Sequence, residues 1–309
     1  RLDGTDVWPP AYRLPADWRG SYLFVVRDGD TAAERDDPWN PVRLPQPPGP
    51  DKSVASLPDA PRQPHLLPRP GVARGTVSEH RFASDLLGSS RRVWVYEPAG
   101  AADLVEEPDL LVLLDGEMWA EAMPVRATLD NLRADGLLPP TLAILVDSVS
   151  PGVRSRELAC DPDVATMLSK ELLVWAAERW PVTGEADRST IAGQSLGGLA
   201  ALFTALSTGD VFGAALAQSG SFWWRNGTEG GQGPEWLTDQ VAATPARRLR
   251  CYLEVGSDEA VNLGPNRRLR DALAAAGHHV TYREFTGGHD RACWRGGLAD
   301  GLVALHRAR

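Results

Sequence analysis

Gly193-Gln194-Ser195-Leu196-Gly197 fits a Gly-x-Ser-x-Gly pattern and stands between two contrasting segments. Residues 188–192 before it predict a strand, and the small and apolar residues 199–203 after it predict a helix. A serine at so sharp a turn holds strained backbone angles, and the flanking glycines let the strand and the helix close around it. The turn exposes the hydroxyl and aims the helix N-terminus at the carbonyl where negative charge develops. Ser195 is therefore the candidate nucleophile.

A histidine that can serve as the base follows later in the chain. A serine hydroxyl needs a positioned base, and in hydrolases with this turn the acid and then the histidine come after the serine. His289 lies just after the alternating segment 280–285, in the loop Thr286-Gly287-Gly288-His289-Asp290. Its glycines allow the imidazole to swing over Ser195. The other three histidines after Ser195 lie at a predicted helix-to-strand turn or on the last predicted helix, so we take His289 as the base.

The acid that orients the imidazole should follow the preceding strand. That predicted strand is 249–255, and the loop after it reads Gly256-Ser257-Asp258-Glu259. Asp258 and Glu259 compete for the role, and either can instead cap the helix predicted to begin near Asn262. The residues alone leave this choice open.

Two backbone amides are expected to form an oxyanion hole. One belongs to Leu196, the residue after the nucleophile. The other should come from the loop after an early core strand, and the continuous apolar run 109–114 predicts such a buried parallel strand. Gly116 follows it at the turn, so we expect the second donor from Glu117 or an immediate neighbour. An ordinary strand-to-helix connection is the alternative for this loop.

Composition excludes several classes of function. The 309 residues are 43% hydrophobic and 24% charged, as in a soluble globular protein, and the net charge of −9 argues against a nucleic-acid partner. No run of 18 apolar residues predicts a membrane span, and no basic segment followed by an apolar one predicts secretion. The three cysteines are scattered, which favours a reducing cytoplasm. No phosphate-binding, dinucleotide-binding or metal-ligand spacing is present, so the expected chemistry needs no cofactor and no metal.

The sequence changes character near residue 70. Residues 1–70 contain strand-like segments at 12–14 and 21–26, followed by a proline-rich stretch from about 40 to 72 that predicts an extended linker or wrapping segment. Residues 71–309 alternate predicted strands and helices, which indicates a doubly wound, mostly parallel sheet of the α/β class. Ligands of such sheets bind at the carboxyl ends of strands. We therefore expect a β-rich N-terminal domain at 1–70 and a catalytic α/β domain at 71–309.

Aromatic and cationic residues gather on the loops at that edge. Trp223 and Trp224 follow the predicted strand 213–218, and Trp294 and Arg295 lie shortly after the candidate base. Arg154 lies on a third loop of the same face. Indole planes and guanidinium groups suit an aromatic, anionic substrate. The alternative is that the tryptophans are core residues and the arginines are solvated.

The chain resembles the iron–enterochelin (enterobactin) esterase family. The resemblance rests on the motifs at 192–202 and 218–224, and above all on Gly287-Gly288-His289-Asp290-Arg291-Ala292-Cys293-Trp294-Arg295-Gly296-Gly297-Leu298. Segments 113–121 and 154–158 also resemble the family, and Asp37-Pro38-Trp39-Asn40-Pro41 resembles a piece of its immunoglobulin-like N-terminal domain. The N-terminal domain is shorter here than in the family, with a region between Val26 and Asp36 trimmed.

The resemblance implies an α/β-hydrolase of the esterase D-like type with a partial immunoglobulin-like N-terminal domain. It implies cleavage of the ester bonds of a ferric catecholate siderophore with a cyclic tri-ester backbone, so that iron is released in the cytoplasm. The family's serine falls on Ser195, its histidine on His289, and its acid on Glu259 rather than Asp258. The alternatives are a feruloyl or acetyl-xylan type of carboxylesterase, and a siderophore carrier with a vestigial triad. The oligomeric state is not predicted.

Overall fold

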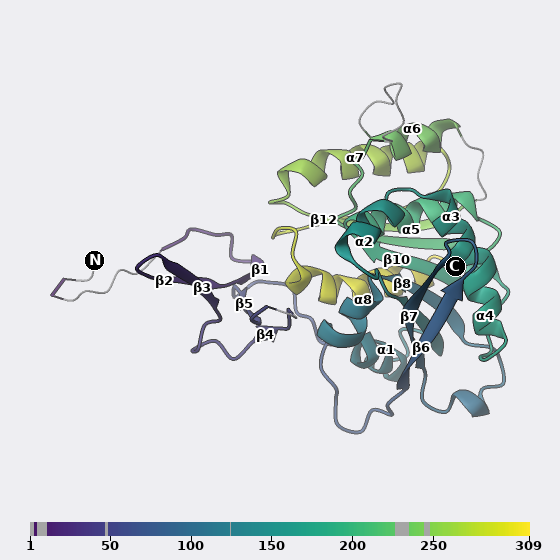
Figure 1. The fold of residues 1–309 in the computed structure, drawn as a ribbon, viewed down its shortest axis with the longest axis horizontal. Helices are drawn as coiled ribbons and strands as arrows, with labels where there is room; N and C mark the ends of the chain where they lie inside the picture. Colours follow the sequence, from purple (N-terminus) through teal and green to yellow (C-terminus); the bar gives the residue numbers. More distant parts are fainter. Residues whose placement is uncertain (1–2, 5–10, 47–48, 124, 226–234, 244–247) are drawn as a thin grey trace.

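The main body of the protein is one eight-stranded sheet with helices on both faces (Figure 1). The computed structural model describes residues 3–4, 11–46, 49–123, 125–225, 235–243 and 248–309. The strand order is β13-β12-β11-β10-β8-β9-β7-β6. The strands are β6 (Thr76–Ser84), β7 (Ser89–Glu97), β8 (Asp109–Leu114), β9 (Thr141–Val146), β10 (Ser189–Gln194), β11 (Ala214–Gln218), β12 (Arg250–Gly256) and β13 (His279–Phe285). The strands from β13 to β9 are parallel, whereas β7 and β6 pair antiparallel at one edge. The mostly parallel sheet expected from the alternating pattern is confirmed.

Helices connect the parallel strands, as crossover connections require. They are α1 (Val125–Ala134), α2 (Pro151–Glu157), α3 (Pro162–Thr166), α4 (Leu173–Ala177), α5 (Leu196–Ser207), α6 (Trp236–Ala243), α7 (Ala260–Ala275) and α8 (Arg291–Arg307), with single turns η1 (Ala101–Asp103), η2 (Met118–Ala122), η3 (Met167–Leu172) and η4 (Ala186–Arg188). α3, η3 and α4 follow one another along one stretch of the chain, and η2 and α1 along another. α2 and α6 were not predicted from the sequence. The start of α2 could have been predicted from the sequence, because Ser150 caps the helix and Pro151 occupies its first turn.

The core has two layers, one on each face of the sheet. Alternate residues of a strand point to opposite faces. In β8, Leu110, Val112 and Leu114 therefore pack with α3, η3, α4, α5 and α7. Leu111 and Leu113 pack on the other face with η2, α1 and α8. Burial on both faces explains why this strand is a continuous apolar run.

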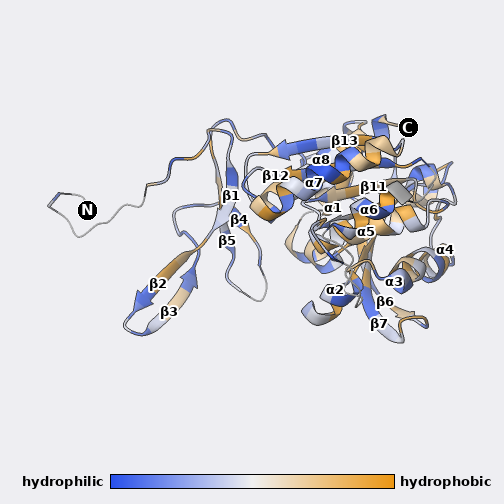
Figure 2. Ribbon diagram, turned by 90° about the horizontal axis from the view of Figure 1, so that it is seen from above, coloured by the Kyte–Doolittle hydropathy of each residue, from blue (hydrophilic) through white to orange (hydrophobic). Residues whose placement is uncertain are grey.

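The N-terminal residues form two small antiparallel sheets beside the main body (Figures 1 and 2). One sheet has the order β1-β5-β4, and the other is a hairpin of β2 and β3. The strands are β1 (Arg19–Tyr22), β2 (Phe24–Asp28), β3 (Thr31–Arg35), β4 (Arg43–Leu44) and β5 (Lys52–Ser56). The strand expected at 12–14 is absent, and the expectation of an extended linker or wrapping segment from about 40 to 72 is wrong for residues 43–44 and 52–56, which form strands. β5 contains no proline, so all its amides can take part in the ladder, and it is the central strand.

The N-terminal part contacts the loop that follows β13. The Arg19 amide donates to the Thr286 carbonyl at 3.2 Å, and Arg19 pairs with Gly287 as a parallel bridge. The amide and the hydroxyl of Ser21 both donate to Oδ2 of Asp290, at 2.6 and 2.8 Å. These contacts hold the segment that carries His289.

Candidate active site

Ser195 stands at the junction of β10 and α5 with φ 57° and ψ −121°, a conformation that non-glycine residues rarely adopt. A Cβ atom on Gly193 would lie 2.3 Å from the Gly197 carbonyl oxygen, so the strand and helix can cross this closely only with glycine there. The Ser195 amide donates to the Gln218 carbonyl at 3.0 Å, and the Ser195 carbonyl accepts from the Ser221 amide at 3.0 Å. Such strain persists only where surrounding structure fixes it, and it recurs at functional sites.

Glu259 binds the imidazole of His289. Its Oε2 lies 2.6 Å from His289 Nδ1 and accepts from Asn262 Nδ2 at 2.7 Å. Its Oε1 accepts from Ser219 Oγ at 2.6 Å and from the Gly256 amide at 2.8 Å. Burial alone would raise the pKa of Glu259, but these hydrogen bonds outweigh it and hold the pKa below its ordinary value. The carboxylate is therefore ionised at neutral pH and favours a proton on Nδ1, which leaves Nε2 free to accept one.

The structure directs Asp258 elsewhere. Its side chain is exposed and accepts from Trp18 Nε1 at 3.0 Å and from Ser257 Oγ at 3.3 Å. The two adjacent acids, which the loop sequence could not separate, therefore face different surroundings. Of these two acids, only Glu259 contacts His289.

Ser195 and His289 line one cavity of about 660 Å³ at the carboxyl ends of the strands. Within the described residues, the Ser195 hydroxyl has one hydrogen-bond neighbour, Ser221 Oγ at 3.3 Å, and none in the imidazole. Contacts between nucleophile and base often tighten only when substrate is bound. Trp294 packs edge-on against the imidazole, with ring centroids 4.7 Å apart, and its Nε1 donates to Ser219 Oγ at 2.9 Å. The indole thus shapes the cavity and also supports the loops around Glu259.

Of the two residues expected to supply amide donors, Glu117 lines the cavity and Leu196 directly follows Ser195 in the sequence. Leu196 is the first residue of α5, and amides of a first helical turn have no partner inside the helix. Burial raises the pKa of the Glu117 carboxyl group, and its Oε2 accepts from the Ser148 amide at 3.1 Å. Gly116 holds this loop against β9, because a Cβ atom there would lie 2.4 Å from the backbone of Leu145.

Arg154 lines the cavity but is already paired. Its Nε and Nη2 donate to the two carboxylate oxygens of Asp115, both at 2.6 Å. The Asp115 side chain is 1% exposed and also accepts from Ser148. The guanidinium that was expected to be free for substrate therefore neutralises a buried carboxylate beside the nucleophile.

Three of the other residues expected to bind substrate lie outside the cavity wall. Arg295 is partly buried and donates to the Arg43 carbonyl of β4 at 3.5 Å, so it faces the N-terminal part. Trp224 packs edge-on against Trp236, with centroids 5.8 Å apart, and belongs to the core periphery. Trp223 is 42% exposed. None of the three is among the residues that line the cavity.

An arginine that was not assigned to substrate binding lines this wall. Arg291, in the first turn of α8 two residues after His289, lines the cavity. Arg92 also lines it but pairs with Asp147 and Glu121. Among the described residues, Arg291 has no ion pair or hydrogen bond, so it is the cavity arginine whose charge is free. Its position two residues after His289 in the sequence is the feature from which its place in the cavity wall could have been predicted.

The described part of the chain holds neither a group of three metal-ligating side chains nor a helix long and apolar enough to cross a bilayer.

Comparisons with known proteins match the whole chain. A family model described as a putative esterase matches residues 84–305, and one described as the N-terminal part of enterochelin esterase matches residues 1–66. The chain is 36% identical to the iron(III) enterobactin esterase of Escherichia coli O6:H1 (strain CFT073) over 327 residues, covering 99% of this chain and 80% of the relative.

Solved structures of esterases are also similar to this chain. The enterobactin esterase of Shigella flexneri, determined in the presence of enterobactin, is 34% identical with a TM-score of 0.85, over 100% of this chain and 83% of that one. A ferulic acid esterase is more distant, at 20% identity and a TM-score of 0.63 over 76% of this chain and 98% of that one, which shows likeness of fold alone.

Proposed function

The chain belongs to the family of iron(III) enterobactin esterases, and we propose that it hydrolyses the ester bonds of a ferric catecholate siderophore of the enterobactin type. The observation that carries this proposal is the placement of Ser195, on its strained turn, in one cavity with His289, whose imidazole is held by a buried carboxylate. The relatives supply the substrate class, since a serine and a base arranged in this way suit any ester.

Each member of the proposed triad has a defined part in the reaction. Ser195 Oγ attacks the ester carbonyl carbon while Nε2 of His289 takes the hydroxyl proton. The carbonyl oxygen becomes an oxyanion. The Leu196 amide and a second backbone amide, at Glu117 or an immediate neighbour, stabilise it together with the N-terminus of α5. The intermediate collapses, and the leaving alcohol takes the proton from Nε2. Water then repeats the sequence on the acyl-enzyme, and Glu259 stabilises the imidazolium in both halves.

The described part of the cavity wall offers an anionic substrate one arginine without an ion-pair partner, despite the overall charge of −9. A ferric tris-catecholate is an anion, and the protein's general field opposes its approach. Arg291 carries the unpaired positive charge of the described wall. We therefore assign it the role of attracting the substrate, with Trp294 as an aromatic face.

The test compares ferric enterobactin with methyl ferulate for the wild type and Ser195→Ala. Mass spectrometry should show the linear, ring-opened product and its shorter fragments from wild type, and intact siderophore with the variant. Preferred cleavage of methyl ferulate would instead support the feruloyl type of esterase. Quenching of tryptophan fluorescence by the siderophore without any product would support a carrier.

We further propose that the reaction takes place in the cytoplasm. Cys160, Cys251 and Cys293 are all unpaired and buried. Free thiols persist in a reducing compartment. Fractionation of cells that produce the tagged protein would test this proposal, and recovery in a periplasmic fraction would contradict it.

A further inference from the structure

The segment that follows β11 contacts both the nucleophile and the acid of the proposed triad. The Gln218 carbonyl accepts from the Ser195 amide at 3.0 Å, and Ser221 Oγ lies 3.3 Å from Ser195 Oγ. Ser219 Oγ donates to Glu259 Oε1 at 2.6 Å. This segment belongs to one of the motifs on which the family resemblance rests, but the triad mechanism gives its side chains no part.

Ser219 holds a backbone conformation that favours glycine. Its φ is 50°, and the residue is completely buried. Its amide donates to the Glu254 carbonyl of β12 at 2.6 Å, which fixes the backbone in place. Strain of this kind persists where the surrounding structure enforces it. Glycine would adopt the same conformation without strain, so what serine adds at this position is its hydroxyl.

The hydrogen bonds of this hydroxyl have one possible direction. Trp294 Nε1 lies 2.9 Å from Ser219 Oγ, and an indole nitrogen can only donate. The single proton of the hydroxyl therefore points to Oε1 of Glu259. That oxygen also accepts from the Gly256 amide at 2.8 Å, so it faces two donors and carries no proton. The two donors fix the plane of the carboxylate and leave Oε2 facing the imidazole.

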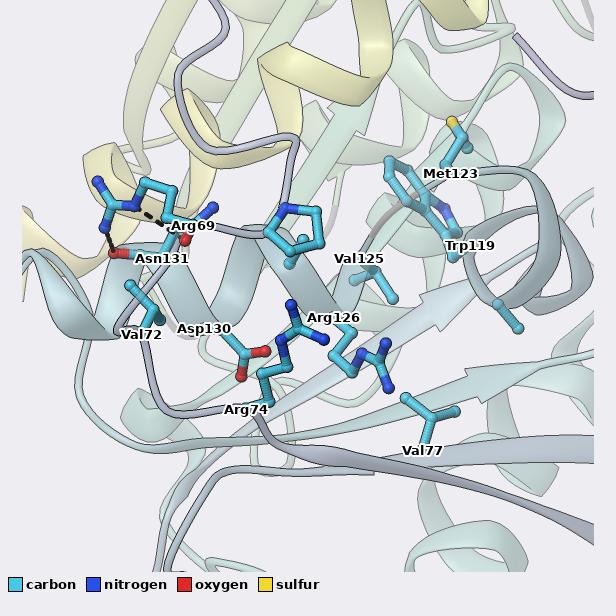
Figure 3. A pocket seen from close by; sticks show the side chains of 13 residues that line it. Arg69, Val72, Arg74, Val77, Trp119, Met123, Val125, Arg126, Asp130 and Asn131 are labelled. Atoms are coloured by element: carbon cyan, nitrogen blue, oxygen red, sulfur yellow. Dashed lines mark hydrogen bonds between the residues drawn. The ribbon is translucent and has the colours of Figure 1, made fainter. Parts of the chain in front are cut away.

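A second chain of hydrogen bonds holds Trp294 from the sheet. Trp119, which borders the cavity between α1 and the segment 68–77 (Figure 3), donates from Nε1 to Gln194 Oε1 at 3.2 Å. Gln194 Nε2 donates to Gln218 Oε1 at 3.1 Å, and Gln218 Nε2 donates to the Trp294 carbonyl at 2.8 Å. Because the Trp119 nitrogen can only donate, it sets the orientation of both amides. The backbone of Trp294 is thereby fixed where its indole nitrogen meets Ser219.

We propose that Ser219 is a positioning residue of the hydrolysis, which fixes the plane and the charge of the Glu259 carboxylate for its contact with His289. The inference rests on the proposed function, because it concerns the same triad. Ser219 is not among the residues that line the catalytic cavity. Loss of its hydroxyl should therefore slow the step in which His289 takes a proton and leave substrate binding unchanged.

The test uses two substitutions that both remove the hydroxyl but differ in their effect on the backbone. Ser219→Ala keeps the left-handed strain, whereas Ser219→Gly relieves it. Each should lower kcat on ferric enterobactin about tenfold or more, because the carboxylate loses a charge-assisted donor, and should keep KM within about twofold.

Ser189→Ala is the matched control. Ser189 is 2% exposed and donates to the Glu185 carbonyl at 3.0 Å, and it begins β10 at the end of the strand away from the catalytic cavity. The control removes an equally buried serine hydroxyl and should keep both kcat and KM within about twofold of the wild type. Circular dichroism checks that all three variants keep the fold.

Labelling by phenylmethanesulfonyl fluoride provides a rate that needs no siderophore. Ser195 Oγ bonds to sulfur, fluoride leaves and the hydroxyl proton passes to His289, and intact-mass spectrometry follows the product. Both Ser219 variants should be labelled about tenfold more slowly than wild type, and Ser189→Ala at the wild-type rate. A wild type that is labelled but does not cleave the siderophore would contradict the proposed function, and the labelling rates would still decide the role of Ser219.

Recovery of the wild-type rate in Ser219→Gly would overturn the proposal, because the loss in Ser219→Ala would then come from the backbone. Unchanged rates in both variants, or a raised KM with kcat unchanged, would overturn it as well. Urea unfolding separates stability from rate. The two Ser219 variants should differ in stability and share the same loss of rate.

Discussion

Replacing Glu259 by glutamine keeps the size of the side chain and disturbs its four hydrogen bonds. Oε1 accepts from Ser219 and Gly256, and Oε2 accepts from His289 and Asn262. A glutamine must place its NH₂ group at one of these two ends, where it faces donors. At the imidazole end it forces the proton onto Nε2, and at either end the negative charge that stabilises the imidazolium is lost.

We expect Glu259→Gln to lower kcat by roughly 10³- to 10⁴-fold, as loss of the triad acid does in other serine hydrolases. This range corresponds to about 4 to 5.5 kcal/mol of transition-state stabilisation. Stability should fall by about 1–3 kcal/mol, because at least one buried donor loses its acceptor. The rate is measured as release of linear fragments from ferric enterobactin by liquid chromatography, and stability by urea unfolding.

Asp258→Asn is the matched control, because it makes the same chemical change one residue away. Asp258 is exposed and accepts only from Trp18 and Ser257, so its variant should keep kcat within about twofold. A larger loss for Asp258→Asn than for Glu259→Gln would refute the reasoning.

Three further changes test the account of the interior. Burial raises the pKa of Glu254 to about 7, so the folded protein loses stability as pH rises from 4.5 to 7, by about 3 kcal/mol. Glu254→Gln should remove that loss. The prediction would be contradicted if the free energies of unfolding of variant and wild type, measured in urea, fell equally over this pH range. Arg91→Ala should cost about 3–5 kcal/mol in urea unfolding, because the buried Glu157 loses its partner, and Arg91→Met/Glu157→Leu should recover most of it. Arg154→Gln should slow hydrolysis of charged and neutral esters alike, because it leaves Asp115 unpaired; a selective loss on the charged ester would show direct substrate contact.

Local patterns predicted the catalytic half of the fold well. The buried parallel strands β8, β9 and β11 are largely apolar runs, and the strand-to-helix turn at Ser195 requires its glycines, so both features can be predicted from neighbouring residues. The positions of His289 and Glu259 after successive strands followed from the same topology.

Side-chain direction was harder to predict because it depends on distant contacts. Trp294 and Arg295 are adjacent on α8 and point about 100° apart, so the two cannot both face the cavity. Trp294 does, and Arg295 turns toward β4. Arg154 lies on the expected face, but its partner Asp115 is 39 residues away in the sequence. The strand at 52–56 was missed because the surrounding prolines dominate the composition of that region.

The most direct test of the central claim is the single-turnover cleavage of ferric enterobactin by wild type, Ser195→Ala, His289→Ala and the double variant. We expect each single variant to lose roughly 10⁴-fold or more in rate, and the double variant to lose little beyond that, because the two residues act as one unit. Ferric siderophore binding should remain in all of them. A Ser195→Ala variant that keeps a tenth of the wild-type rate, or losses that multiply in the double variant, would contradict the proposed active site.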